Sequence, residues 1–171
     1  VWGDKDKDNN NNEHKSKCEI SLIASGIALF DFTSIDASVT SLDLSLNPAI
    51  SPVASDVVSI KSLSMRECTL TNIEFLKSFK VLKHIDVSEN MLESLSGVES
   101  CRELRSVNAS YNRLRDISSL YPLEKLKSIH LSNNDLSFDS VMPLLSLSNI
   151  SCLDVLDNPC MSEVSTTQTG K

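Results

Sequence analysis

The sequence contains few of the residues that build nucleotide-binding loops and aromatic cores. Of its 171 residues only four are Gly, and aromatic residues make up 5%. A glycine-rich phosphate loop is therefore not expected, and the core must be aliphatic. No apolar stretch reaches the roughly 18 residues of a membrane span, and residues 1–17 contain no apolar core of a signal peptide. The sequence therefore predicts neither a transmembrane helix nor a signal peptide.

The charge balance argues against polyanionic partners. Lys and Arg number 16 and Asp and Glu number 23, which gives a net charge of −7. Direct binding of nucleic acid or of an anionic membrane needs a surplus of basic residues, so neither is expected. All 11 basic residues of segment 18–160 lie between Lys61 and Lys127, and the segments on either side carry acidic residues only. The centre of the chain is therefore mildly basic between acidic ends.

Sequence patterns of enzymes and metal sites are missing. The chain has no Walker-type phosphate loop, no G-x-S-x-G and no H-E-x-x-H, and its three His are scattered: His14, His84 and His130. The five Cys include no C-x-x-C pair. We expect no catalytic residue, no metal site and no cofactor. Free, mostly buried thiols are the default and fit a reducing compartment, while a disulfide through Cys18 or Cys160 remains an alternative.

A repeat of about 22 residues runs through most of the chain. Apolar residues recur at positions 1, 4, 6 and 11 of each unit, and Asn recurs at position 9. Position 4 is filled by Leu42, Leu63, Ile85, Val107, Ile129 and Leu153. One period before Leu42 stands Ile20, which we place at position 4 of a degenerate first unit, with Leu22 at position 6 and Ile27 at position 11. The array therefore holds about seven units.

The spacing within a unit predicts its local structure. Positions 3 to 7 alternate polar and apolar residues, which is the pattern of a strand with one buried face. Positions 11, 14, 17 and 20 are apolar at every third residue, as on one face of a tight helical turn. Each unit is thus a strand, a turn and a helical return, and stacking supplies the core. We predict a disordered tail over residues 1–17, a repeat array over 18–160 and a polar tail over 161–171.

The Asn at position 9 has a predicted structural role. It follows the strand, where the chain turns inward and backbone groups lose their strand partners. An Asn side chain both donates and accepts, so it satisfies such groups in its own turn and in the neighbouring ones. The expected members of this buried ladder are Asn47, Asn90, Asn112, Asn134 and Asn158, with Ser25 and Cys68 as gaps.

These features are similar to those of the leucine-rich repeats. The pattern L-x-x-L-x-L-x-x-N-x-L covers roughly residues 18–160. The period resembles the short class that includes the nuclear protein-phosphatase-1 regulator, the spliceosomal A-prime protein and the leucine-rich dynein light chain. The resemblance implies an α/β solenoid, a right-handed superhelix of about seven repeats with a parallel sheet on its concave side. It also implies a protein-interaction module without catalytic activity, or a phosphatase regulatory subunit.

The concave face is the predicted binding surface. Solenoids bind proteins on such faces, and positions 3, 5, 7 and 8 of each unit are expected to point there. The candidate contact residues for a protein partner are Arg66, His84, Asp86, Asn108, Tyr111 and His130. The basic residues at position 2 are either an ordinary solvated row or a strip for an acidic partner: Lys61, Lys83, Arg105 and Lys127.

The leading functional prediction is an intracellular interaction module, cytoplasmic or cytoskeletal with a nuclear location open, in a scaffold, cytoskeletal or ribonucleoprotein assembly. The alternative is a secreted or surface recognition array of the internalin or receptor kind. The last unit is soon followed by the polar tail, so we expect its cap to be incomplete and Leu153 and Val155 to be partly covered. An apolar end of this kind predicts weak self-association.

Overall fold

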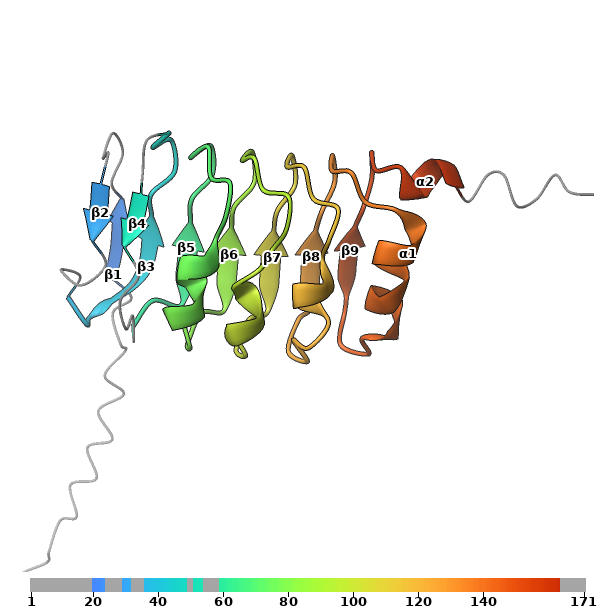
Figure 1. Ribbon diagram of the computed structural model, residues 1–171. Helices are drawn as coiled ribbons and strands as arrows, with labels where there is room; N and C mark the ends of the chain where they lie inside the picture. The colour runs from blue at the N-terminus through green and yellow to red at the C-terminus, as the bar shows by residue number, and fades with distance from the viewer. Residues whose placement is uncertain (1–19, 24–28, 32–35, 49–50, 54–58, 164–171) are drawn as a thin grey trace, which may run out of the picture.

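The main element of the molecule is a parallel sheet to which each repeat supplies one strand. The computed structural model describes residues 20–23, 29–31, 36–48, 51–53 and 59–163. Along the seven-stranded sheet lie β1 (Ile20–Ile23), β3 (Val39–Asp43), β5 (Ser62–Ser64), β6 (His84–Asp86), β7 (Ser106–Asn108), β8 (Ser128–His130) and β9 (Cys152–Asp154). The strands follow one another in space as they do in the chain, which is the stacking of an open solenoid (Figure 1).

The register of the sheet follows the repeat. The position-4 residues of adjacent units pair with one another from β3 to β9: Leu42, Leu63, Ile85, Val107, Ile129 and Leu153. The first strand departs from the predicted register, because Leu22 and not Ile20 pairs with Leu42. The predicted register of this degenerate unit was therefore wrong by two residues, so that the pairing is shifted. Ser25 and Ile27 lie outside the described residues.

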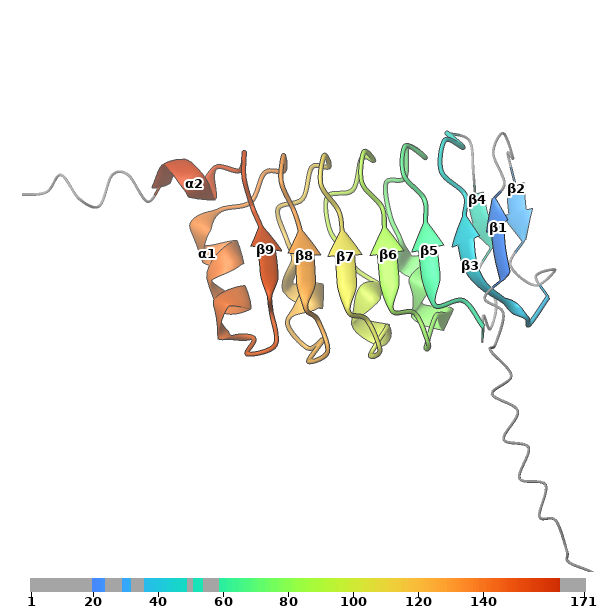
Figure 2. The same ribbon diagram turned by 180° about the vertical axis from the view of Figure 1, so that it is seen from behind.

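The helical returns cover the side of the sheet opposite to the face that Figure 2 presents. They are η2 (Glu74–Ser78), η3 (Val98–Ser100), η4 (Ser118–Leu120) and, in the longer sixth unit, α1 (Phe138–Val141) followed by η5 (Met142–Ser146). In the first two units the return is extended instead: β2 (Leu29–Asp31) and β4 (Ser51–Val53) form a separate parallel pair. A helical return for every unit was thus a wrong prediction. Pro52 and Val53 disfavour helix, which accounts for the second unit.

The core is a continuous aliphatic stack between the sheet and the returns. In the three central units the residues at positions 14, 17 and 20 are at most 1% exposed: Ile73, Leu76, Phe79, Leu95, Val98, Cys101, Ile117, Leu120 and Leu123. In the sixth unit Val141 and Leu144 are buried, whereas Met142 and Leu145 on the same helical segment face outward. Burial therefore follows the three-residue spacing rather than hydrophobicity alone.

The ends of the array differ in what the structure describes. The proposed tail over residues 1–17 and residues 164–171 lie outside the described part of the chain. The first residues of the segment 161–171 belong to α2 (Cys160–Glu163), a short helix that follows the last turn. Leu153 and Val155 of the last unit are only partly buried, while their counterparts Ile129 and Leu131 are fully buried.

The position-9 side chains join adjacent units through the backbone. Asn90 shows the pattern: its Nδ2 donates to the carbonyl oxygens of Val87 and Ser88 in its own turn and of Met65 one unit earlier, at 2.8–3.0 Å. Its Oδ1 accepts from the N–H of Cys68 and of Leu70. Four of the five Asn are buried, and Asn112 is partly buried.

Cys68 occupies the position-9 site of the unit that lacks Asn. Its Sγ donates to the carbonyl oxygen of Leu44 at 3.2 Å and to that of Arg66 at 3.4 Å. The thiol therefore reproduces two of the donor contacts of an Asn amide, although a sulfur hydrogen bond is weaker. Burial raises the pKa of this thiol, so it stays protonated and able to donate.

Candidate functional site

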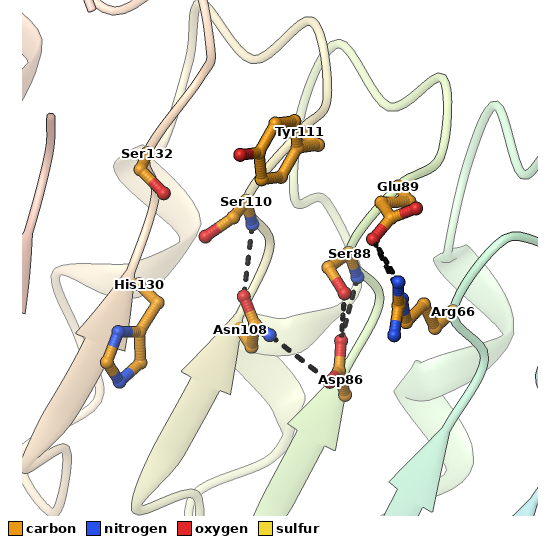
Figure 3. Close-up of a pocket in the computed structure, with 9 residues that line it drawn as sticks. All are labelled: Arg66, Asp86, Ser88, Glu89, Asn108, Ser110, Tyr111, His130 and Ser132. Atoms are coloured by element: carbon orange, nitrogen blue, oxygen red, sulfur yellow. Dashed lines mark hydrogen bonds and ion pairs between the residues drawn. The ribbon is translucent and has the colours of Figure 1, made fainter. Parts of the chain in front are cut away.

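A hollow on the exposed sheet face gathers most of the predicted contact residues. It has a volume of about 410 Å³ and lies over the carboxyl ends of β5 to β8 (Figure 3). Its lining consists of Arg66, Asp86, Ser88, Glu89, Asn108, Ser110, Tyr111, His130 and Ser132. Five of the six candidate contact residues are in this set. His84, at the beginning of β6, is exposed on the same sheet but does not line the hollow.

The floor of the hollow is built from side chains that close the turns after the strands. Oδ1 of Asp86 accepts from the N–H of Ser88 at 2.9 Å and from its hydroxyl at 2.6 Å. Oδ1 of Asn108 likewise accepts from the N–H of Ser110 at 3.2 Å, and Nδ2 of Asn108 donates to Asp86 at 3.1 Å. Asp86 and Asn108 are therefore held in place by one another and by their own turns.

This turn-closing role of position 5 was missed in the sequence. Asp43 and Asp154 accept the N–H two residues later in the same way, at 2.9 and 3.1 Å. The available signal was Asp or Asn at position 5 in four of the six regular units, since these side chains commonly bond the backbone two residues on. The position-5 side chains at Asp43, Asp86, Asn108 and Asp154 therefore have a structural role in closing the turns.

One wall of the hollow is an ion pair between two repeats. Nε of Arg66 donates to Oε1 of Glu89 at 2.8 Å, and Arg66 also lies 3.2 Å from the carboxylate of Glu67. The hydrogen bond to Glu89 raises the pKa of the Arg66 guanidinium above its ordinary value. Arg66 is consequently a paired wall residue rather than an unpaired anchor. Its partner Glu89, at position 8, was expected on this face but was not one of the six candidate contact residues.

Tyr111 stands at the rim of the hollow above Ser110 (Figure 3). The residue is 57% exposed, which makes it the large aromatic group that the sheet face offers to solvent among the described residues. Its backbone has φ 56°, in the left-handed region. Across the hollow from the Arg66–Glu89 pair (Figure 3), Nε2 of His130 lies 2.9 Å from the hydroxyl of Ser128, and His130 is half-buried.

Position 8 carries the same left-handed backbone in the six regular units. The φ values lie between 54° and 61° at Leu46, Glu67, Glu89, Tyr111, Asn133 and Asp157. Only Asn and Asp tolerate this region readily among non-glycine residues, so the others are held there by the turn and its ladder Asn. The side chain at position 8 is thereby directed outward at the rim of the sheet face.

The described residues form no site for a metal ion, since no three His, Cys, Asp or Glu side chains gather closely enough. His84 and His130 belong to β6 and β8, with β7 between them. Within the same part of the chain no helix is long and apolar enough to span a membrane.

The lining of the hollow consists of hydroxyl, amide, imidazole and paired ionic groups around one exposed aromatic ring.

Solved structures with the same architecture are leucine-rich-repeat proteins. Internalin C2 from Listeria monocytogenes matches with a TM-score of 0.63 and 25% identity, over 71% of this chain and 53% of that chain. The leucine-rich-repeat ectodomain of the plant membrane receptor kinase GASSHO1/SCHENGEN3 from Arabidopsis thaliana matches with a TM-score of 0.57 and 23% identity, over 71% and 16% of the two chains. The fold is a leucine-rich-repeat solenoid.

The leucine-rich-repeat match is structural and partial. A second internalin from Listeria monocytogenes, internalin F, shares 18% identity over 71% of this chain and 43% of that chain, with a TM-score of 0.50. The chain thus spans about half the length of internalin C2 and less of the other two. No protein-family model and no curated protein matches the sequence.

Proposed function

We propose that this leucine-rich-repeat chain is a non-catalytic interaction module that binds a segment of another protein over the sheet hollow. The single observation that carries the proposal is the hollow itself, an open surface beside a Tyr ring that is 57% exposed. An exposed aromatic ring buries a large apolar area on binding while its hydroxyl keeps a polar partner. Parallel-sheet faces of solenoids present such surfaces.

The chemistry of the floor suits an extended segment. Ser88, Ser110 and Ser132 follow three adjacent strands, and their small side chains let a partner backbone come close. The Arg66–Glu89 pair and the Asp86–Asn108 contact are already formed without a ligand. Binding therefore does not need to order these side chains, which lowers the entropic cost of association.

The similar structures support a protein as the partner. The receptor-kinase ectodomain was solved in complex with CASPARIAN STRIP INTEGRITY FACTOR 2. That complex belongs to the plant receptor, and it supports a protein partner for a solenoid of this architecture. The net charge of −7 disfavours nucleic acid or an anionic membrane as the main ligand, because both are negatively charged.

An intracellular assembly is the location that we propose for this module. The thiols of Cys68 and Cys101 are buried, and Cys152 is exposed as a free thiol, a state that a reducing compartment maintains. A secreted or surface recognition array is the second candidate, favoured by the similarity to internalins and to a receptor ectodomain. Thiol titration of the protein from its native source separates the two, because a secreted form would show Cys18 or Cys160 in a disulfide.

The test of the binding surface compares two variants in which an exposed apolar side chain becomes Asn. Tyr111→Asn removes the ring at the hollow and keeps a residue that accepts the left-handed backbone. Leu145→Asn changes a residue that is 64% exposed on η5, on the helical side. Partners captured from lysate by the parent chain are identified, and their affinities for the three chains are measured by calorimetry.

We expect Tyr111→Asn to weaken binding by roughly 1–2 kcal/mol and Leu145→Asn to leave it unchanged. Thermal melts of both variants establish that the array stays folded. A partner whose affinity ignores Tyr111 but falls with Leu145→Asn would place the binding surface on the helical side and refute the proposal.

A further inference from the structure

The basic residues at repeat position 2 lie in one continuous row at the amino edge of the sheet, where the strands begin. Lys61, Lys83, Arg105 and Lys127 directly precede β5, β6, β7 and β8. The backbone N–H of each of the last three donates to the carbonyl oxygen of the preceding member, at 2.8–2.9 Å. Strand neighbours lie about 4.8 Å apart, so the row is roughly 14 Å long. We call these four residues the amino-edge row.

Three members of the row have no carboxylate partner. No ion pair within the described residues involves Lys83, Arg105 or Lys127. Arg105 and Lys127 are exposed, and Lys83 is partly exposed. The carboxylate beside them, Glu103, is bound by Lys125 at 2.5 Å. The pKa of Glu103 is lowered chiefly by that hydrogen bond, and Arg105 and Lys83 add to the effect. The row therefore keeps a surplus of positive charge.

The opposite edge of the same face has the reverse sign. Positions 5 to 8, where the strands end, carry one base, Arg66, and six acids: Asp43, Glu67, Asp86, Glu89, Asp154 and Asp157. The sheet face is thus polarised across the strands, basic where they begin and acidic where they end. A ligand that complements the amino edge is therefore acidic. Its negative charge should end before the carboxyl edge, where the carboxylates would repel it.

From this arrangement we infer that the amino-edge row binds a short acidic segment of a partner protein, rich in Asp or Glu, which runs across β5 to β8. Extended chain rises about 3.3 Å per residue, so four to five residues cover the row. A nucleic acid fits less well, because a uniformly charged backbone wide enough to cross the face from β5 to β8 would meet the carboxylates of Glu67, Asp86 and Glu89. The inference stands independently of the hollow at the carboxyl edge.

A fluorescein-labelled peptide of about eight Glu residues is the probe for this inference, and its binding is followed by fluorescence anisotropy. The test variant is Lys83→Gln with Arg105→Gln. The control is Arg113→Gln with Arg115→Gln, which removes the same charge from exposed residues outside the row. Arg115 loses only an exposed pair with Asp135, which contributes little to stability.

We expect the parent chain to bind the Glu peptide with an affinity that falls as NaCl is raised, because exposed charges are screened. The test variant should bind about tenfold more weakly and the control within about twofold. Equal losses in both variants, or no binding to the parent chain, would overturn the inference. A thymidine oligonucleotide of equal charge that bound more tightly than the peptide and depended on the same pair would overturn it in favour of nucleic acid.

Tyr111→Asn keeps this result separate from the proposed function. The ring lies at the carboxyl edge, so its loss should leave the affinity for the Glu peptide unchanged. If a natural partner depends on Tyr111 while the Glu peptide does not bind, only the amino-edge inference fails. If the peptide binds through Lys83 and Arg105 while no partner depends on Tyr111, only the proposed use of the hollow fails.

Discussion

The side chain of Asn90 donates a hydrogen bond from Nδ2 to the backbone carbonyl of Met65, 25 residues earlier, at 2.8 Å. This bond crosses from one repeat to the previous one. The same Nδ2 also donates to two carbonyl oxygens of its own turn. Oδ1 of Asn90 accepts from the backbone N–H groups of Cys68 and Leu70 in the preceding unit. Coupling between neighbouring units in this solenoid therefore runs through buried amides as well as through apolar packing.

Asn90→Ala should lower the free energy of unfolding by roughly 1–3 kcal/mol, because it leaves buried backbone groups without partners. Asn112→Ala should cost less, since Asn112 is only partly buried. Asn90→Cys copies the residue at position 68 and should fall between the parent and Asn90→Ala. Urea unfolding of the three variants measures the order, and equal stability of parent and Asn90→Ala would contradict a structural role for the ladder.

At Gly97, the N-cap residue of η3, the structure predicts that adding a side chain destabilises the array. Gly97 has φ 114°, and a Cβ atom there would lie 2.6 Å from the carbonyl oxygen of Ile73. Gly97→Ala should therefore destabilise the array by about 1–3 kcal/mol. Ser96→Ala changes an exposed neighbour and should have little effect. A Gly97→Ala chain as stable as the parent in urea would show that the turn relaxes freely.

At Leu46 the structure predicts a gain in stability. This residue is 59% exposed and has φ 61°, so it bears the strain of the left-handed region without burying its side chain. Leu46→Asn should raise the free energy of unfolding by about 0.5–1 kcal/mol, since Asn tolerates this backbone. Leu46→Ala retains the strain and is the control. Identical unfolding curves for the Asn and Ala variants would argue that backbone strain is not the cause.

The repeat period made the sheet and the core predictable from sequence. Position 4 is occupied by an apolar residue in every unit, and the resulting column from Leu42 to Leu153 is the observed pairing. The register of the first strand was not predicted correctly, because its unit lacks the regular pattern and was placed only by counting back one 22-residue period from Leu42. Leu22 pairs with Leu42 because the chain between them is shorter than a regular unit.

The candidate site was less predictable, because its geometry depends on contacts between repeats. The Arg66–Glu89 pair joins residues 23 positions apart, and nothing in a single unit distinguishes a paired Arg from an unpaired one. The left-handed backbone at position 8 was also hidden. Glycine would have marked it, but Leu46, Glu67 and Tyr111 carry no such signal. The sequence predicted that the side chains of the hollow share one face of the sheet, but it did not show which of them are already paired with one another.

Stability should fall at alkaline pH because of a buried thiol. Burial raises the pKa of Cys101 to about 11, whereas the thiol of an unfolded chain titrates near 9.0. Below pH 9.0 the Cys101 thiol is protonated in both the folded and the unfolded chain, and its contribution to the free energy of unfolding is fully present. Between the two values the unfolded chain loses the proton first, so the free energy of unfolding falls, by roughly 1–3 kcal/mol at the upper end.

Urea unfolding at about pH 8 and about pH 10.5 measures this loss. Cys101→Ala removes the titrating group and should show a smaller decrease between the two pH values than the parent chain, whatever its stability at pH 8. The change with pH isolates the thiol from other groups that titrate in the same range. A variant that loses as much stability as the parent would assign the alkaline effect to those other groups.

The last repeat predicts concentration-dependent association. Leu153 and Val155 are partly buried where the central units bury the same positions fully, and Leu156 and Met161 beside them are 58% and 47% exposed. Apolar area of this kind favours contact with another copy of the chain, while four acidic residues and no base in segment 128–160 oppose it. The association should therefore be weak and should strengthen with salt.

Sedimentation velocity at rising concentration, with and without added NaCl, measures this association. Leu156→Gln with Met161→Gln should keep the chain monomeric, because both side chains are on the surface and their loss opens no core cavity. Leu46→Gln with Met91→Gln removes exposed apolar groups from other units and should leave association as in the parent. If the two double variants behave alike, or if salt weakens the association, the contact does not form through the last repeat.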